Sequence, residues 1–184
     1  MEFVQVHLEC ANRNLTLYKA AEMKKVGIIM GSDSDLPVAK KATDILTALG
    51  VPFEVHVYSA HRTPQQVHDF VAAARDNGFG VIIAAAGMAA HLAGVVAAGT
   101  TLPVIGIPCK SSVLDGMDAL LSTVMMPPGI PVATVAIDGG ANAGLLAAEI
   151  IALGDETLTA KLNAKREADA AKVLSKDADI ASRL

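Results

Sequence analysis

Three short polar segments carry the side chains of this chain that could do chemistry. They are Gly31-Ser32-Asp33-Ser34-Asp35, Ser59-Ala60-His61-Arg62-Thr63-Pro64 and Gly87-Met88-Ala89-Ala90-His91. The first and third segments follow apolar runs and the second follows an alternating apolar pattern, so each is expected at the point where a strand ends. Together they offer an anion-binding turn, a forked cation and two imidazole rings, which suits acid–base chemistry on an anionic ligand.

The first segment has the composition of an anion-binding turn. Its small residues allow the backbone to approach an anion, and the helix start that follows offers unpaired N–H groups. Ser32 and Ser34 add hydroxyl donors, and Asp35 could accept from a ribose diol. The same side chains could also simply cap a helix that starts near Pro37, so this segment alone leaves both interpretations open.

The second segment places a histidine beside an arginine. Arg62 presents a planar, forked donor that matches phosphate. A histidine can change its protonation state near neutral pH, so His61 could act both as an acid and as a base. A solvent-exposed or capping histidine is the alternative, but the position at a strand end and the neighbouring arginine favour a functional residue.

The third segment ends in His91, at the expected start of a helix within apolar chain. A buried histidine whose ring is satisfied by the backbone is an equally common case. The place at a third strand end keeps His91 as a candidate site residue. His7, His56 and His68 are interpreted as structural or surface residues.

The elements that position these segments follow from the hydrophobic pattern. Strands are predicted at Val26–Met30, Phe53–Val57, Val81–Ala86, Val104–Ile107 and Val132–Ile137. Helices are predicted from near Pro37, from Pro64, after His91, over Asn142–Leu153 and from Asp155 onward. The second helix is expected to begin with Thr63 as its N-cap and Gln66 completing a capping box.

Strands that alternate with helices indicate an α/β fold with a central parallel five-stranded sheet covered on both faces. Ligands of such sheets bind at the carboxyl ends of strands, near a switch in strand order. If the first strand lies between the second and third, as in a flavodoxin-like order, all three polar segments meet. Residues 23–184 are interpreted as one domain with an extra C-terminal helix from about 155, and residues 1–22 as an extension, with Met23 the candidate initiator.

Composition disfavours several kinds of function. A net charge of -4 and an aromatic content of 3% argue against a nucleic-acid partner. The GxGxxG, GxxxxGKS/T, HExxH and GxSxG patterns are absent, and Cys10 and Cys109 form no metal-binding pair, so neither cofactor nor metal is expected. Hydrophobic residues make up 52% and charged residues 18%, which hints at contacts between subunits.

The uncharged stretch between Asp76 and Lys110 is long enough to suggest a transmembrane helix. Its glycines and prolines indicate instead a buried strand, a turn, a helix, a turn and a second buried strand. Glu2 and Glu9 interrupt the region where a signal peptide would need an apolar run. With only two cysteines, a reducing, cytoplasmic location without a membrane partner is expected.

Together, GSDSD, SAHRTP and AAGMAAHL closely resemble the class I N5-carboxyaminoimidazole ribonucleotide mutases of purine biosynthesis. This PurE family is also described as the catalytic subunit of phosphoribosylaminoimidazole carboxylase. MPPGIPVATVAI and GGANAGLLAAEIIAL match later segments, so the resemblance covers about Lys25 to Leu153. It implies a three-layer flavodoxin-like fold and a homo-octamer with active sites near subunit contacts.

The resemblance also assigns roles to residues. His61 matches the acid–base histidine of the family, Arg62 and the two serines are expected near the phosphate, and Asp35 near the ribose. The substrate-binding residues implied by motif position are Ser32, Ser34, Asp35, Ser59, Arg62, Gly87 and His91. The family often has a glycine and a proline where this chain has Met88 and Ala93, which bears on the shape of the carboxylate pocket.

The implied reaction is an isomerisation without a cofactor. N5-carboxyaminoimidazole ribonucleotide would become 4-carboxy-5-aminoimidazole ribonucleotide by decarboxylation, trapping of CO2 and recarboxylation. Relatives that carboxylate the aminoimidazole ribonucleotide directly look like SAHKT after the second strand and lack the AAHL histidine, so Arg62 and His91 favour the mutases. Two alternatives stay open: direct carboxylation with CO2, and a non-catalytic flavodoxin-like module that holds a mononucleotide or flavin.

Overall fold

The computed structural model describes residues 23–181 and 183, and its centre is a five-stranded parallel sheet. The strands are β1 (Lys25–Met30), β2 (Phe53–Val57), β3 (Phe79–Gly87), β4 (Val104–Cys109) and β5 (Ala133–Thr134). Their order is β2-β1-β3-β4-β5, so β1 lies between β2 and β3 as in the predicted flavodoxin-like arrangement. The predicted extension, residues 1–22, lies outside the described residues.

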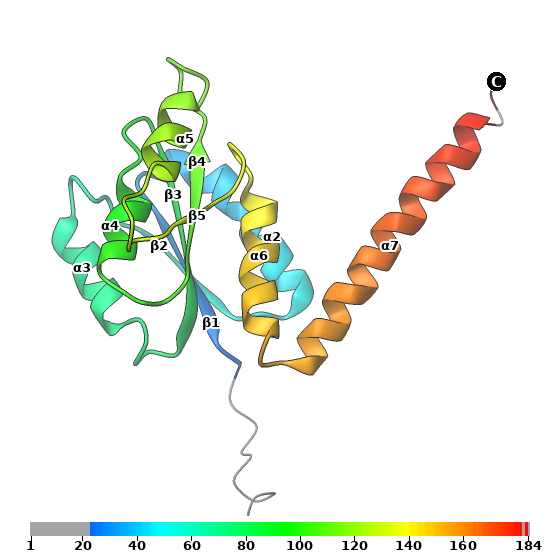
Figure 1. Ribbon diagram of the computed structural model, residues 1–184, viewed down its shortest axis with the longest axis horizontal. Helices are drawn as coiled ribbons and strands as arrows, with labels where there is room; N and C mark the ends of the chain where they lie inside the picture. Colours follow the sequence, from blue (N-terminus) through cyan, green and yellow to red (C-terminus); the bar gives the residue numbers. More distant parts are fainter. Residues whose placement is uncertain (1–22, 182, 184) are drawn as a thin grey trace, which may run out of the picture.

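Helices cover both faces of the sheet and make three layers (Figure 1). They are α2 (Leu36–Leu49), α3 (Pro64–Ala73), α4 (Leu92–Ala98), α5 (Met117–Val124), α6 (Gly140–Ala152) and α7 (Glu156–Ala181), with a short 3-10 helix η1 (Asp33–Asp35) before α2. Helices α2 and α6 lie on one face, and α3, α4 and α5 on the other. The predicted α/β fold is confirmed.

Each face of the sheet has its own buried apolar cluster. Ile28 and Ile83 pack under α2 and α6, whereas Ile29 and Ile82 pack under α3 and α4. Successive side chains of a strand point to opposite faces, so a strand covered on both sides must be apolar throughout. This requirement explains the uncharged stretch before Lys110, which forms β3, α4 and β4 as predicted.

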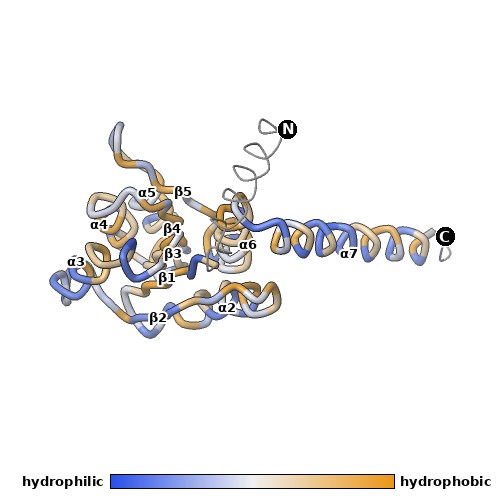
Figure 2. Tube along the Cα trace, turned by 90° about the horizontal axis from the view of Figure 1, so that it is seen from below, coloured by the Kyte–Doolittle hydropathy of each residue, from blue (hydrophilic) through white to orange (hydrophobic). Residues whose placement is uncertain are grey.

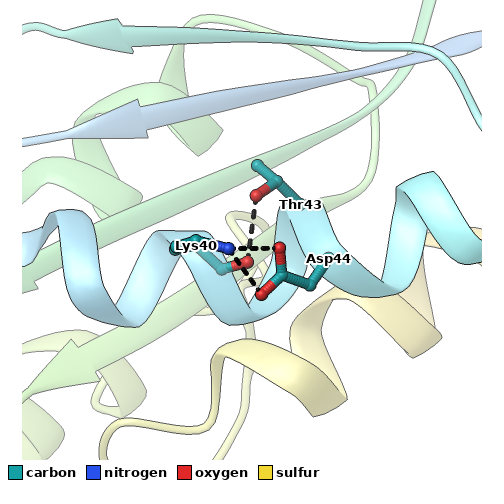
Figure 3. A network of polar contacts seen from close by, with 3 residues as sticks. All are labelled: Lys40, Thr43 and Asp44. Atoms are coloured by element: carbon teal, nitrogen blue, oxygen red, sulfur yellow. Dashed lines mark hydrogen bonds and ion pairs between the residues drawn. The ribbon is translucent and has the colours of Figure 1, made fainter.

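Helix α2 shows the usual division between a buried and a solvent face. On the solvent face the Lys40 ammonium lies 2.6 Å from an Asp44 carboxylate oxygen, and the Thr43 hydroxyl donates to the Lys40 carbonyl at 2.9 Å (Figure 3). Such an exposed pair contributes only about 0.3–0.5 kcal/mol. Leu46 is fully buried on the other face, and Gly50, with a φ of 75°, ends the helix.

Two elements differ from the prediction. The apolar run predicted as a strand over Val132–Ile137 forms only the two-residue β5, because beyond Thr134 it bonds irregularly to β4. The amides of Val135 and Asp138 still donate to the carbonyls of Gly106 and Pro108, so the run is paired without a regular ladder. Helix α5 was missed altogether, although Met117, Leu121 and Val124 recur at helical spacing.

Helix α7 starts against the domain and then leaves it (Figures 1 and 2). Leu158 and Leu162 are buried one turn apart, and the Lys161 ammonium donates to the Leu49 carbonyl at 2.8 Å. Further along, Val173 and Leu174 are exposed. No helix within the described residues is both long and apolar enough to cross a membrane.

Candidate active site

A cavity of about 550 Å³ opens at the carboxyl ends of β1, β2 and β3. Here the chain order of the strands reverses, since β2 and β3 lie on opposite sides of β1. Seven of the eight predicted site residues line this cavity: Ser32, Ser34, Asp35, Ser59, His61, Arg62 and Gly87. The eighth, His91, contacts one of the seven.

The two candidate histidines meet at the cavity. Nε2 of His61 lies 3.0 Å from Nδ1 of His91, and the two ring planes are inclined by 82°. A hydrogen bond at this distance needs one proton between the two nitrogens, so one ring donates and the other accepts. Both residues are exposed, so the alternative of a buried His91 satisfied by the backbone is wrong.

Arg62 ties the second segment to the first. Its Nη2 donates to the Gly31 carbonyl at 2.7 Å, and its Nε and its backbone amide donate to Oγ of Ser59 at 3.5 and 3.2 Å. A guanidinium carries five N–H groups, so these bonds orient it and leave donors for an anion in the cavity.

Thr63 closes the turn that carries His61 and Arg62 instead of capping α3. Its hydroxyl accepts from the Ser59 amide at 2.8 Å and donates to the Ser59 carbonyl at 3.2 Å. No side-chain bond caps α3, so the predicted capping box is wrong. The reason is competition: a hydroxyl engaged within its own turn is withdrawn from the helix N-terminus. Pro64 does open α3, as predicted.

The GSDSD segment combines a capping residue with a buried carboxylate. Ser32 caps η1, since its Oγ accepts from the Ser34 amide at 3.3 Å. Asp35 makes no capping bond to α2 and is only 8% exposed. Burial raises the pKa of the Asp35 carboxyl above its usual value, although a hydrogen bond from the Ser32 backbone acts in the opposite direction. The capping alternative therefore holds for Ser32 but not for Asp35.

Cys109, at the end of β4, lies beside Asp35 beneath the cavity. Burial, together with the neighbouring charges of Asp35 and Asp138, raises the pKa of its thiol to about 12. The thiol is therefore neutral at physiological pH, which excludes it as a nucleophile. Among the described residues, no three His, Cys, Asp or Glu side chains gather where they could hold a metal ion.

The third segment brings close backbone packing and a strained residue to the cavity. A Cβ on Gly87 would lie 3.3 Å from the carbonyl oxygen of Cys109, its partner in the β3–β4 ladder. Met88 has a φ of 53°, in the left-handed region that suits the glycine often found there in the family. Ala93 is buried in α4 and does not line the cavity.

Three further lining residues, Lys110, Ser111 and Ser112, escaped the sequence analysis. They follow β4 directly, at the same edge of the sheet as the three polar segments. A polar run at the end of a fourth parallel strand was the signal that could have identified them. Lys110 adds a cation, paired with Asp115 at 3.0 Å, to the side of the cavity nearest α5.

A parallel sheet in flavodoxin-like order, with serine hydroxyls, a guanidinium and paired histidines around a cavity at its switch point, defines an α/β protein of the kind that binds small ligands at the carboxyl ends of its strands. The chain belongs to the AIR carboxylase family, whose profile matches residues 25–172. The family resemblance seen in the three motifs is thereby confirmed.

Individual relatives agree with this family. The chain is 57% identical over 145 residues to the N5-carboxyaminoimidazole ribonucleotide mutase of Pyrococcus abyssi, which covers 79% of this chain and 83% of that protein. It is 57% identical over 144 residues to the mutase of the same name from Bacillus subtilis, covering 77% and 89%. The crystal structure of Treponema denticola PurE matches with a TM-score of 0.76 and 30% identity, over 85% of this chain and 98% of that one.

Proposed function

We propose that this chain is an isomerase of purine biosynthesis that converts N5-carboxyaminoimidazole ribonucleotide to 4-carboxy-5-aminoimidazole ribonucleotide. The observation that carries the proposal is the contact between His61 and His91 at a cavity that Asp35 and Arg62 also line. An acid–base residue and groups that can bind an anion thus share a space large enough for a small nucleotide.

The polar wall of the cavity binds the ribonucleotide. Arg62, oriented by Gly31 and Ser59, offers its free donors to the phosphate together with the hydroxyls of Ser32 and Ser34. Asp35 accepts hydrogen bonds from the ribose hydroxyls. Gly87 lets the backbone of β3 pack closely against β4, because a Cβ there would meet the Cys109 carbonyl oxygen. The ring of the substrate approaches β3 at this residue.

The first chemical step breaks the carbamate. Protonated His61 donates a proton to the exocyclic nitrogen, the bond between that nitrogen and the carboxyl carbon breaks, and CO2 and aminoimidazole ribonucleotide result. His91, hydrogen-bonded to His61 at 3.0 Å, holds the ring that moves the proton in one orientation.

The second step forms the new carbon–carbon bond. The aminoimidazole is an enamine, nucleophilic at ring carbon 4, and this carbon attacks the trapped CO2. Neutral His61 then removes the proton from carbon 4, which restores the aromatic ring. The histidine returns to its starting state, so the cycle has no net proton change and needs no cofactor. Confinement of CO2 beside the ring replaces a collision in solution with a reaction at high effective concentration.

The same proposal includes an assembly and a location. Residues 23–184 form one catalytic domain outside the 1–22 extension, and the protein is a cytoplasmic homo-octamer without nucleic-acid or membrane partners. Two features support the assembly: the low share of charged residues, 18%, and the exposed apolar side chains of α5 and α7. Surface covered by a partner needs no charge, and exposed apolar patches are typical of interfaces.

The direct test is turnover of synthetic N5-carboxyaminoimidazole ribonucleotide by the purified full chain. We expect the 4-carboxy product to form without added cofactor. Chromatography measures its rate of formation, which is compared with the rate in the absence of enzyme. Product formed only from aminoimidazole ribonucleotide and bicarbonate would identify a direct carboxylase. A protein that purifies yellow, binds flavin and turns over neither substrate would be a ligand-binding module.

A further inference from the structure

The rim of the active-site cavity carries a side chain that its backbone does not favour. Met88 follows β3 directly, lines the cavity and is 61% exposed. Its φ of 53° is costly for any residue with a Cβ and costs glycine almost nothing. Its carbonyl accepts from the Ala90 amide at 2.9 Å, so the turn that leads to His91 is built on this conformation. A methionine kept in such a conformation at a site points to a use for its side chain.

The cavity has a polar and an apolar side. The polar lining residues come from the segments after β1, β2 and β4 and include Ser32, Arg62 and Lys110. The apolar side comes from the end of β3 and the start of α4 and includes Gly87 and Leu92. Met88 supplies the long flexible side chain of the apolar side, and an unbranched thioether adapts its shape to what lies beneath it.

We propose that the Met88 side chain covers the apolar side of the cavity and retains CO2 between the two chemical steps. The inference rests on the proposed function. Once the bond from nitrogen to the carboxyl carbon breaks, CO2 is neutral and apolar, so charged side chains hold it poorly and enclosure must keep it beside ring carbon 4. Met88 lines the cavity and is exposed to solvent, so its side chain lies at the mouth of the cavity.

The test compares Met88→Ala with Met88→Gly in the full chain. Alanine removes the cover but keeps a Cβ at this φ, whereas glycine removes both. With N5-carboxyaminoimidazole ribonucleotide as substrate, the aminoimidazole ribonucleotide released per 4-carboxy product is measured by chromatography after subtraction of the enzyme-free decay. We expect both variants to raise this ratio roughly threefold or more, because escape of CO2 then competes better with recapture.

A second readout tests the backbone part of the inference. Met88→Gly should melt about 2–4 °C above Met88→Ala, since only glycine relieves the left-handed strain. The control is Leu153→Ala at the end of α6, which removes another exposed apolar side chain (90%) outside the cavity and outside α5 and α7, and should leave the release ratio at the wild-type value.

Two outcomes overturn the inference in distinguishable ways. If wild type turns over and both Met88 variants keep its release ratio, Met88 is no cover and the proposed function stands. If wild type forms no 4-carboxy product from the carbamate substrate, the proposed function fails and the role of Met88 fails with it.

Discussion

The contact between His61 and His91 is the residue-level feature on which the chemistry depends. The facing nitrogens, 3.0 Å apart, can share one proton, which fixes the tautomer of one ring through the other. The turn closed by Thr63 and Ser59 holds His61 from the side of β2, and the turn that includes Met88 and Ala90 holds His91 from the side of β3. Each ring is therefore positioned by its own strand end.

His61→Asn should abolish most turnover while substrate binding and the fold persist. Asparagine can keep a hydrogen bond to His91 but cannot give and take a proton, and acid–base groups typically supply 10²–10⁴-fold in rate. Steady-state kinetics and a binding titration with the 4-carboxy product measure the two parts. A kcat within about tenfold of wild type would remove His61 from the acid–base role.

Arg62→Ala should raise KM by about 10–100-fold with a smaller effect on kcat, because charge-assisted bonds to a phosphate are each of order 1.5–3 kcal/mol. Arg75→Ala is the matched control: it removes a guanidinium bonded to Thr101, away from the cavity, and should leave KM unchanged. An unchanged KM for the ribonucleotide in the Arg62 variant, with weaker binding of the phosphate-free nucleoside, would contradict the phosphate role.

The sequence located most of this cavity but not its internal contacts. The residue types in the segments after the first three predicted strands were enough to find Asp35, His61 and Arg62, since the carboxyl ends of parallel strands lie at one edge of the sheet. Lys110 was missed, although it follows the fourth strand directly. The bond between His61 and His91 could not be foreseen, since it depends on the geometry of two turns, and one of them relies on a left-handed Met88.

At the scale of the elements, the spacing of apolar residues and the burial of each element explain which secondary-structure predictions succeeded. Strands β1, β3 and β4 were predicted because each is a continuous apolar run in the interior of the sheet, and the edge strand β2 was predicted because Phe53, Val55 and Val57 alternate with other residues. The run that includes β5 is just as apolar, yet it pairs only with β4 at the sheet edge, and apolar character alone does not determine a regular ladder. Helix α5 is short and begins directly after a glycine, Gly116, and its apolar residues Met117, Leu121 and Val124 are exposed.

The packing of α2 on α6 gives a prediction about stability. A Cβ on Gly144 would lie 2.8 Å from the carbonyl oxygen of Ala42 and 3.0 Å from its Cα, so Gly144→Ala must push the two helices apart. We expect a loss of about 1–3 kcal/mol in the free energy of unfolding, measured in urea. Gly154→Ala, where a Cβ meets no atom within 4 Å, is the control. Equal stability of the two variants would show that this helix contact is not close-packed.

At the scale of the whole molecule, the exposed extension of α7 is not explained by packing within the described residues of a single chain. Its first part packs on the domain through Leu158 and Leu162, and the Arg166 guanidinium donates to Glu149 on α6 at 2.6 Å, whereas the part beyond extends away from the sheet (Figure 1). A helix without tertiary contacts is only marginally stable in water. The exposed Val173, Leu174 and Ile180 on this extension are consistent with a partner subunit.

The proposed assembly is tested by light scattering on the full chain at micromolar concentration. We expect the mass of an octamer, because α7 and the exposed apolar face of α5 both gain cover from neighbouring subunits. A monomeric mass would contradict the proposal and would leave those apolar side chains in need of another partner.

The most direct test of the proposed reaction follows the carboxyl carbon itself. Substrate labelled in the carbamate carboxyl is converted by the full chain in a large pool of unlabelled bicarbonate, and the label in the 4-carboxy product is measured by mass spectrometry. A mutase that confines CO2 beside ring carbon 4 should retain most of the label, since recapture outruns dilution into solution. A product that carries mainly carboxyl from the pool, with aminoimidazole ribonucleotide plus CO2 as the better substrate, would contradict the mutase assignment and identify a direct carboxylase.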